Sequence, residues 1–232
     1  MLFSELKLEK IIFEARYEKG FLYWDNSGKA LADIVSKFPE IEVQQVNVSN
    51  VQSVWPNEGI TLNFNQLKAD VTQDYPQSLE TFKEVSSYLI RIVETHLKMR
   101  TFTRIGARYT FILPTNSEKE AQGIAAKSNL ININLERLQP FGNEVLDRQI
   151  VIRMEDESRG YLLNFSNQKR EIALKLPKPL AIEASRFYPN VVMFDIDCYT
   201  KKLVDVSNLG VPDIIRVNLK TIEDNLFSLI GV

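Results

Sequence analysis

The sequence is poor in the residues that build disulfides and metal sites. Its 232 residues include one cysteine, Cys198, and one histidine, His96. A single cysteine excludes a disulfide framework and a thiolate metal site within one chain. It also suits a reducing compartment, so we expect a cytoplasmic protein. Histidine-dependent catalysis would have to use His96 or a second chain, and no Ser, Cys or Asp pattern near it predicts a triad.

Long apolar runs and a strong charge bias are missing as well. The N-terminal MLFSELKLEK carries acids and lysines where a secretory signal needs an apolar run, and no stretch reaches the length of a membrane span. Lys and Arg total 28 against 30 Asp and Glu, which gives a net charge of -2. We therefore expect no membrane partner. The balance also argues against a nucleic-acid partner, because nucleic-acid-binding domains are usually basic.

The fingerprints of common cofactors are absent. Gly28-Lys29-Ala30 lacks both the leading glycine and the metal-binding Ser or Thr of a phosphate loop, and no dinucleotide motif follows a predicted strand. Aromatic residues are not interleaved with basic ones as a base-stacking platform requires. We therefore predict no cofactor, and the sequence favours a non-catalytic protein without deciding the point.

The most distinctive stretch is Thr101–Pro114, TFTRIGARYTFILP. Apolar and polar residues alternate along it, which is the period of a half-buried strand. No acid occurs between Thr95 and Ser117, whereas the basic residues there are Lys98, Arg100, Arg104 and Arg108. The missing side chain at Gly106 would let a phosphate, a carboxylate or another backbone approach the two flanking arginines. We therefore predict a ligand site at Arg104, Gly106 and Arg108; the alternative is an exposed face balanced by acids of the next strand.

A second candidate site lies on the strand predicted from Val191 to Tyr199. Asp195 and Asp197 share one face of that strand, and Asp205 or Glu183 could add a third carboxylate. Oxygen-rich clusters of this kind bind Mg²⁺ or Mn²⁺. The alternative is a solvent-facing strand, since two carboxylates without a fixed third ligand seldom hold a metal.

The order of the predicted elements defines an α+β protein. Strands are predicted at Leu6–Tyr17, Ile41–Val51, Gly59–Asn65, Leu67–Gln73, Thr101–Pro114, Glu144–Met154, Gly160–Phe165, Glu171–Leu176 and Val191–Tyr199. Helical spacing of apolar residues occurs at Ala30–Phe38, Leu79–His96, Ser117–Ala125 and Pro212–Ile230. Leu130–Pro140 is compatible with a strand or a helix. This order predicts an antiparallel sheet packed by long helices.

Two short similarities link the halves of the chain. Glu14–Tyr17 and Gly106–Tyr109 share Ala-Arg-Tyr, and Asn26–Lys29 and Asn116–Lys119 share Asn-Ser-x-Lys. In each half a strand leads into a capped helix, several strands follow, and an amphipathic helix closes the unit. Such a pattern is expected of an internal repeat, although short matches also arise by chance.

We therefore predict a single domain over residues 1–232, either undivided or composed of two pseudo-repeats, 1–98 and 99–232. The β-α-β(n)-α order of each half is similar to the halves of the TATA-binding protein and to helix-grip folds. The similarity concerns layout and carries no function.

Several segments together resemble a sporadically distributed family of uncharacterised bacterial proteins of about this length. In chain order they are IIFEARYEKG, ALADIVSKFPEIEV, DYPQSLETFKEV, RIGARYTFILP, MFDIDCYT and IEDNLFSLIGV. The most specific pieces are Arg-x-Gly-x-Arg-Tyr at Arg104–Tyr109 and the pair Phe38-Pro39. Where such proteins often carry a histidine in the closing helix, this chain has Asn218 or Asn225. The resemblance implies a bacterial cytoplasmic protein and supplies no activity.

These observations predict a binding or interaction module. The positive strand face would engage an acidic protein partner, a second copy of the chain or a phosphate-bearing ligand. One alternative is a metal-dependent enzyme acting on phosphate esters or nucleotides, with Asp195 and Asp197 as ligands and the arginines holding the phosphate. Another is a component of a mobile bacterial defence or toxin-control system, which rests on the sporadic distribution of the resembling family alone.

Overall fold

The computed structural model describes residues 6–127, 140, 148–170 and 189–230, with side chains up to residue 226. The segment Leu130–Pro140, apart from Pro140, lies outside the described residues, as do the predicted strand Glu171–Leu176 and Glu183. Within the described part, no helix is both long enough and apolar enough to cross a bilayer.

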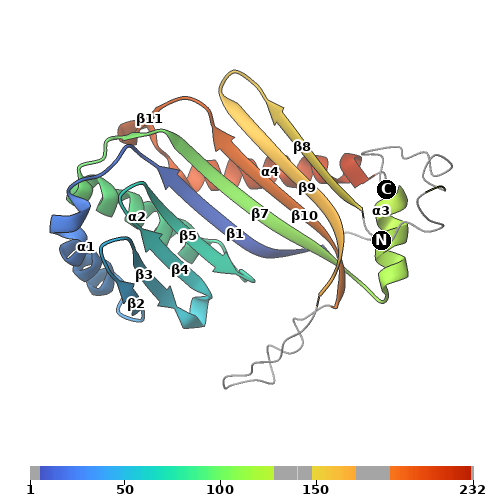
Figure 1. The fold of residues 1–232 in the computed structure, drawn as a ribbon, viewed down its shortest axis with the longest axis horizontal. Coiled ribbons are helices and arrows are strands. Elements are labelled where there is room, and N and C mark those ends of the chain that lie inside the picture. The colour runs from blue at the N-terminus through green and yellow to red at the C-terminus, as the bar shows by residue number, and fades with distance from the viewer. Residues whose placement is uncertain (1–5, 128–139, 141–147, 171–188, 231–232) are drawn as a thin grey trace.

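In these residues nine strands form one antiparallel sheet (Figure 1). They are β1 (Lys7–Arg16), β2 (Glu42–Val46), β3 (Val51–Trp55), β4 (Ile60–Phe64), β5 (Lys68–Asp74), β7 (Arg104–Thr115), β8 (Gln149–Glu155), β9 (Arg159–Lys169) and β10 (Asn190–Thr200). Their order across the sheet is β2-β3-β4-β5-β1-β7-β10-β9-β8, which places β1 and β7 side by side in the middle. The short strands β6 (Thr101–Phe102) and β11 (Val204–Asp205) pair separately.

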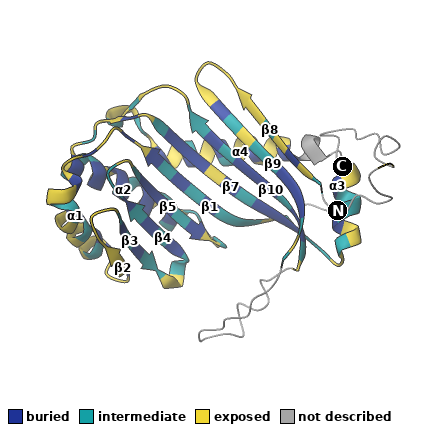
Figure 2. Ribbon diagram, in the orientation of Figure 1, coloured by how far each residue is buried: buried dark blue, intermediate teal, exposed yellow. Residues whose placement is uncertain are grey.

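Helices cover one face of this sheet. They are α1 (Tyr23–Lys37), α2 (Glu80–Leu97), α3 (Glu118–Lys127) and α4 (Val211–Ile230), and each contributes buried residues to a single core (Figure 2). The predicted α+β class with a large antiparallel sheet is therefore confirmed. The helices are of ordinary length: α1, α2 and α4 have 15, 18 and 20 residues, within the usual range of about 8 to 20.

The sheet has a helix-covered face and an open face, and β7 contributes side chains to both. Its alternate residues Ile105, Ala107, Tyr109, Phe111 and Leu113 are buried in the core beneath the helices. The hydroxyl of Tyr109 donates a hydrogen bond to the carbonyl of Ile215 in α4, at 2.8 Å. Arg104 and Arg108 consequently project from the other face, as the alternation predicts.

The prediction of one strand over Ile41–Val51 is wrong, because β2 and β3 form a hairpin there. The side-chain carbonyl of Asn47 accepts hydrogen bonds from the backbone N–H groups of Ser49 and Asn50, at 2.8 and 2.9 Å. An asparagine that binds its own backbone in this way offers the chain a turn in place of a continued ladder. Val46 and Val48 continue the alternation of a strand into the turn, so the sequence pattern did not reveal it.

Candidate functional site

The open face of the sheet carries a band of charged side chains across its four central strands. We call this band the charged belt; it consists of Glu14, Arg16, Lys68, Asp70, Arg104, Arg108, Asp195 and Asp197. The strand register assembles it from distant parts of the sequence, for example by placing Glu14 of β1 opposite Gly106 of β7 and Asp197 of β10 opposite Arg108. The predicted site residues Arg104, Gly106, Arg108, Asp195 and Asp197 thus all lie together.

Gly106 gives space to Arg104 of its own strand. A Cβ atom at Gly106 would lie 3.1 Å from Nη1 of Arg104, so the glycine allows the guanidinium to lie flat on the sheet. From there Nη1 donates to Oε1 of Glu14 at 2.7 Å, and Nη2 donates to Oδ2 of Asp197 at 2.6 Å. Arg104 therefore connects β1, β7 and β10.

Arg108 forms a two-pronged ion pair with Asp195. Its Nε donates to Oδ1 of Asp195 at 2.7 Å, and its Nη2 donates to Oδ2. The hydroxyl of Thr110 lies 3.3 Å from the same Oδ1. The hydrogen bond that Arg108 donates to Asp195, together with the negative charge of Asp195, raises the pKa of Arg108 above its ordinary value although burial opposes this. Parallel N–H···O bonds of this kind fix the arginine in direction as well as in place.

The pKa values of the Glu14 and Asp197 carboxyl groups are shifted in opposite directions. Burial favours the neutral form of Glu14, but Arg16 at 2.8 Å and Lys68 at 3.2 Å outweigh it and lower the pKa of Glu14. Burial is the dominant influence on Asp197, and the pKa of Asp197 is raised despite the guanidinium of Arg104. The charge of Glu14 is therefore better compensated than that of Asp197.

In the charged belt, three of the four positive groups lie outside the negative groups, whereas Arg104 is only 20% exposed. The exposed fraction of the side chain is 53% for Arg16, 51% for Arg108 and 41% for Lys68, against 16% for Glu14, 10% for Asp70, 6% for Asp195 and 20% for Asp197. The belt has as many acids as bases, yet solvent meets mainly guanidinium and ammonium groups. A formally balanced band thus presents a cationic surface.

Two hollows open in this face. One, of about 130 Å³, is lined by Ile12, Glu14, Arg16, Arg104, Gly106, Arg108 and Asp197. The other, of about 400 Å³, is lined by Arg16, Thr103, Arg104, Arg153, Leu162, Asp197, Tyr199 and Thr200. The three residues of the predicted ligand site therefore line one hollow together.

Sequence reasoning missed Tyr199 and Arg153, which extend the belt toward β8. The ring of Tyr199 lies against Gly160, where a Cβ atom would approach it to 2.3 Å. The guanidinium carbon of Arg104 is 4.8 Å from the centre of this ring, and that of Arg153 is 5.9 Å away. Gly160, in a predicted strand, was an available signal, because strand glycines often mark a close approach. The sequence does not indicate that Tyr199 is the side chain that lies against Gly160.

The predicted metal site has a different environment from the one expected. Asp195 and Asp197 are each ion-paired with an arginine, and Asp205 accepts hydrogen bonds from Ser207 at the start of the short 3₁₀ turn Val206–Asn208. Among the described residues, no group of three or more His, Cys, Asp or Glu side chains is placed to hold a metal ion. The metal site stays a prediction, which calorimetric titration with Mn²⁺ tests.

His96 lies away from the belt, near the end of α2. Its Nε2 is 2.8 Å from Oδ2 of Asp33 in α1, and its backbone carbonyl accepts a hydrogen bond from Asn26 at 3.0 Å. These contacts join the two helices.

No protein-family model and no curated protein matches the chain. The resemblance to a sporadically distributed bacterial family therefore stays a prediction.

Proposed function

We propose that the protein is a non-catalytic binding module whose open sheet face engages an acidic protein or a phosphate-bearing ligand. The observation that carries the proposal is the layering of the charged belt, with exposed Arg16, Arg108 and Lys68 above poorly exposed carboxylates. The carboxylates hold the cations in place, so that a partner would meet a preorganised surface and pay less to order it. A second copy of the chain is one candidate for the acidic protein.

The smaller hollow suits a single anionic group. Within the described residues, Arg16 uses Nε to bind Glu14, and Arg108 uses Nε and Nη2 to bind Asp195. Their other N–H donors stay available, and both side chains line the same hollow. The planar fork of arginine matches the oxygens of carboxylate and phosphate groups.

Binding of poly-glutamate and of inorganic pyrophosphate, measured by calorimetry at low salt, tests this proposal. The double variant R16Q/R108Q should weaken binding roughly a hundredfold or more, since two charged hydrogen bonds of about 1.5–3 kcal/mol each are lost. Binding should also fall with salt, because exposed charges are screened. The matched control is R216Q/K220Q, which removes two exposed charges from α4.

Equal weakening in both double variants would show that only net charge matters and would contradict a site at the belt. Absence of binding to either probe at low salt would contradict it as well. Arg104 has a separate role in the proposal, because its guanidinium is only 20% exposed and lies between two carboxylates. R104Q should therefore lower thermal stability. R16Q/R108Q should lower it as well, because the poorly exposed Asp195 loses its ion-pair partner, so binding is compared at a temperature at which circular dichroism shows each variant to be folded.

We also propose that the chain is a duplicated unit with the layout of the halves of the TATA-binding protein. One half runs from β1 through α1 to α2, and the other runs from β7 through α3 to α4. The strand order reads outward in the same way from β1 and from β7. Glu14 and Gly106, which occupy equivalent places in the Ala-Arg-Tyr similarity, also face each other in the β1–β7 register. A pseudo-two-fold axis through this pair would cross the centre of the charged belt.

A further inference from the structure

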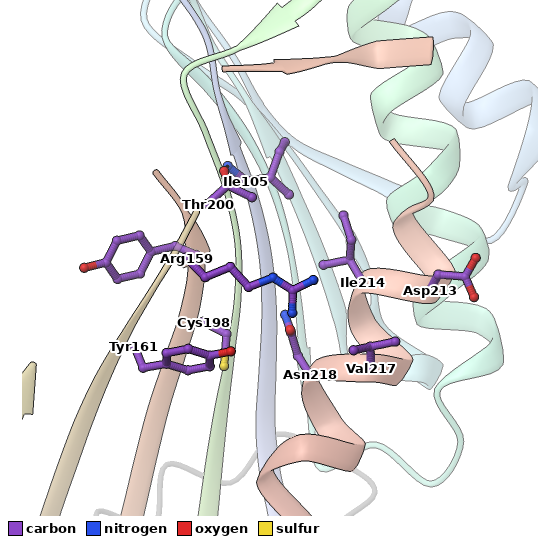
Figure 3. Close-up of a pocket in the computed structure, with 10 residues that line it drawn as sticks. Ile105, Arg159, Tyr161, Cys198, Thr200, Asp213, Ile214, Val217 and Asn218 are labelled. Carbon is purple, nitrogen blue, oxygen red and sulfur yellow. The ribbon is translucent and has the colours of Figure 1, made fainter. Parts of the chain in front are cut away.

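A further cavity lies on the opposite, helix-covered side of the sheet. It has a volume of about 160 Å³ and opens between α4 and the ends of β7, β9 and β10 (Figure 3). It is lined by Ile105, Arg159, Tyr161, Cys198, Tyr199, Thr200, Asp213, Ile214, Val217 and Asn218. None of the eight charged-belt residues lines it, although Tyr199 and Thr200 line both this cavity and the larger hollow of the open face.

The walls of this cavity are mainly apolar. Ile105 and Cys198 form part of its floor and are 1% and 3% exposed, and Ile214 and Val217 face them from α4 (Figure 3). Burial raises the pKa of the Cys198 thiol to about 12, so the thiol is neutral and acts as a small apolar wall. An apolar cavity of about 150 Å³ is large enough to hold benzene, which sets the size of ligand that fits.

The polar side chains that interrupt the apolar wall include Arg159, Tyr161, Thr200 and Asn218. Arg159 reaches from β9 toward Asn218 of α4 (Figure 3). Asn218 is 7% exposed, and a carboxamide so little exposed usually has a hydrogen-bond partner. Within the part of the chain that the structure describes, neither side chain makes a hydrogen bond or an ion pair. Asp213, the one acid of the lining, points away from the cavity and pairs with Arg216 at 2.9 Å (Figure 3).

We propose that this cavity binds a small carboxylate with an aromatic or branched aliphatic body. The guanidinium of Arg159 would take both carboxylate oxygens, and the amide N–H of Asn218 would donate one further hydrogen bond. The body would fill the space between the sheet and the apolar side of α4. One guanidinium and one amide match a single negative charge, whereas a phosphate would leave charge and acceptors unmatched against an apolar wall.

Calorimetric titration of the full chain with benzoate and with its neutral isostere benzamide tests this assignment. Benzoate should bind with a Kd of about 1 mM or tighter, as small ligands can, and at least tenfold more tightly than benzamide. R159Q should remove that preference, lowering the affinity for benzoate roughly tenfold or more, which is the loss expected for a charged hydrogen bond. The matched control R91Q removes an exposed arginine from α2, which contributes no residue to the lining of the cavity, and it should leave benzoate binding unchanged.

A second variant tests whether the ligand occupies the cavity, because it fills the cavity and leaves the charge of Arg159 in place. V217W places an indole in the cavity from an exposed helix position, so it should abolish binding of benzoate and benzamide alike while the circular dichroism spectrum stays the same. Three results would overturn the proposal: no benzoate binding at about 10 mM, a preference for benzoate that survives R159Q, or benzoate affinity that survives V217W. Loss of binding in R16Q/R108Q but not in R159Q would instead place benzoate on the charged belt.

Discussion

Two glycines let large side chains lie flat on the open face of the sheet. Gly106 accommodates the guanidinium of Arg104, and Gly160 accommodates the ring of Tyr199. The Tyr199 hydroxyl donates to Oε1 of Glu155 at 2.9 Å and accepts from Nε of Arg153 at 3.0 Å. The ring is therefore held at its edge as well as against the strand, and it cannot move aside without losing these contacts.

Gly160→Ala should destabilise the protein for this reason. The new methyl group would lie 2.3 Å from the Tyr199 ring, and displacement of the ring should cost about 1–3 kcal/mol in the free energy of unfolding, as overpacking does. The matched control is Gly28→Ala in α1, where a Cβ atom meets nothing within 4 Å. It should stabilise the protein by about 0.5–1 kcal/mol, because alanine favours a helix over glycine. Urea denaturation measures both; destabilisation by Gly28→Ala, or none by Gly160→Ala, would contradict this account.

Glu14 and Asp197 both bind Arg104, but their charges should contribute differently to stability. The folded pKa of Glu14 lies below its ordinary value of 4.5, so its charged form stabilises the fold. That contribution is complete above pH 4.5 and is lost as the pH falls through the folded pKa. The folded pKa of Asp197 lies above 3.8, so its charged form opposes folding at neutral pH.

Thermal denaturation of E14Q and D197N across pH 3 to 8 tests this difference. E14Q should lower Tm more than D197N at pH 7, and the deficit of E14Q should shrink as the wild-type Glu14 is protonated below about pH 4.5. The two variants keep side chains of nearly the same shape, so packing is matched. A larger loss for D197N at pH 7, or a deficit of E14Q that is independent of pH, would show that the pKa directions are wrong.

At the scale of the elements, helix α2 contains a buried hydroxyl group without a hydrogen-bond partner among the described residues. Ser86 is fully buried, and its hydroxyl has no hydrogen-bond partner in the described residues. The hydroxyl of the next residue, Ser87, donates to the carbonyl of Lys83 at 2.7 Å. Burial of an unpaired hydroxyl costs free energy, whereas a paired one does not carry that cost.

Ser86→Ala should therefore increase the free energy of unfolding by up to about 1 kcal/mol, since alanine also has the higher helix propensity. Ser87→Ala gains the same propensity but loses a hydrogen bond, and should be close to neutral. The difference between these adjacent variants isolates the buried hydroxyl, and guanidinium denaturation measures it. A Ser86→Ala variant less stable than Ser87→Ala would indicate that the hydroxyl has a partner.

The elements themselves were largely predictable, because their apolar periods match the faces that they bury. Alternation along Thr101–Pro114 predicts β7 and its two faces, and helical spacing over Leu79–His96 predicts α2. The hairpin between β2 and β3 was missed because Asn47 makes a local turn that apolar periodicity does not register.

Four of the eight residues of the charged belt were predicted as site residues, but the ion pairs that they form were not. Alternation assigns Arg104 and Arg108 to one face, and Asp195 and Asp197 to one face, yet it says nothing about which strands are neighbours. The register between β7 and β10 brings the arginines of the predicted ligand site into ion pairs with the aspartates of the predicted metal site. Pairing across a sheet depends on contacts between distant residues, and one sequence does not contain that information directly.

In the molecule as a whole, the central pair β1 and β7 joins two halves that are continuous in sequence. β1 begins and α4 ends at the same end of the sheet (Figure 1). If the chain is a duplicated unit, its two halves should fold in either order. Their joint sheet depends on the β1–β7 ladder, and this ladder does not need a covalent link between α2 and β7.

A circular permutant tests this idea. It would begin at Met99, join Val232 to Met1 through a flexible linker of roughly ten residues, and end at Lys98. We expect it to unfold in one cooperative transition with the circular dichroism spectrum of the parent, because the new termini lie outside β7 and the order of strands within each half is kept. The control permutant, cut between Ala107 and Arg108 with the same linker, should fail to fold, since β7 pairs with neighbours on both sides there.

Two separate transitions in the first permutant would mean that the halves fold without forming the shared sheet. Failure of both permutants would mean that the α2–β7 connection is required, which a duplicated unit does not predict.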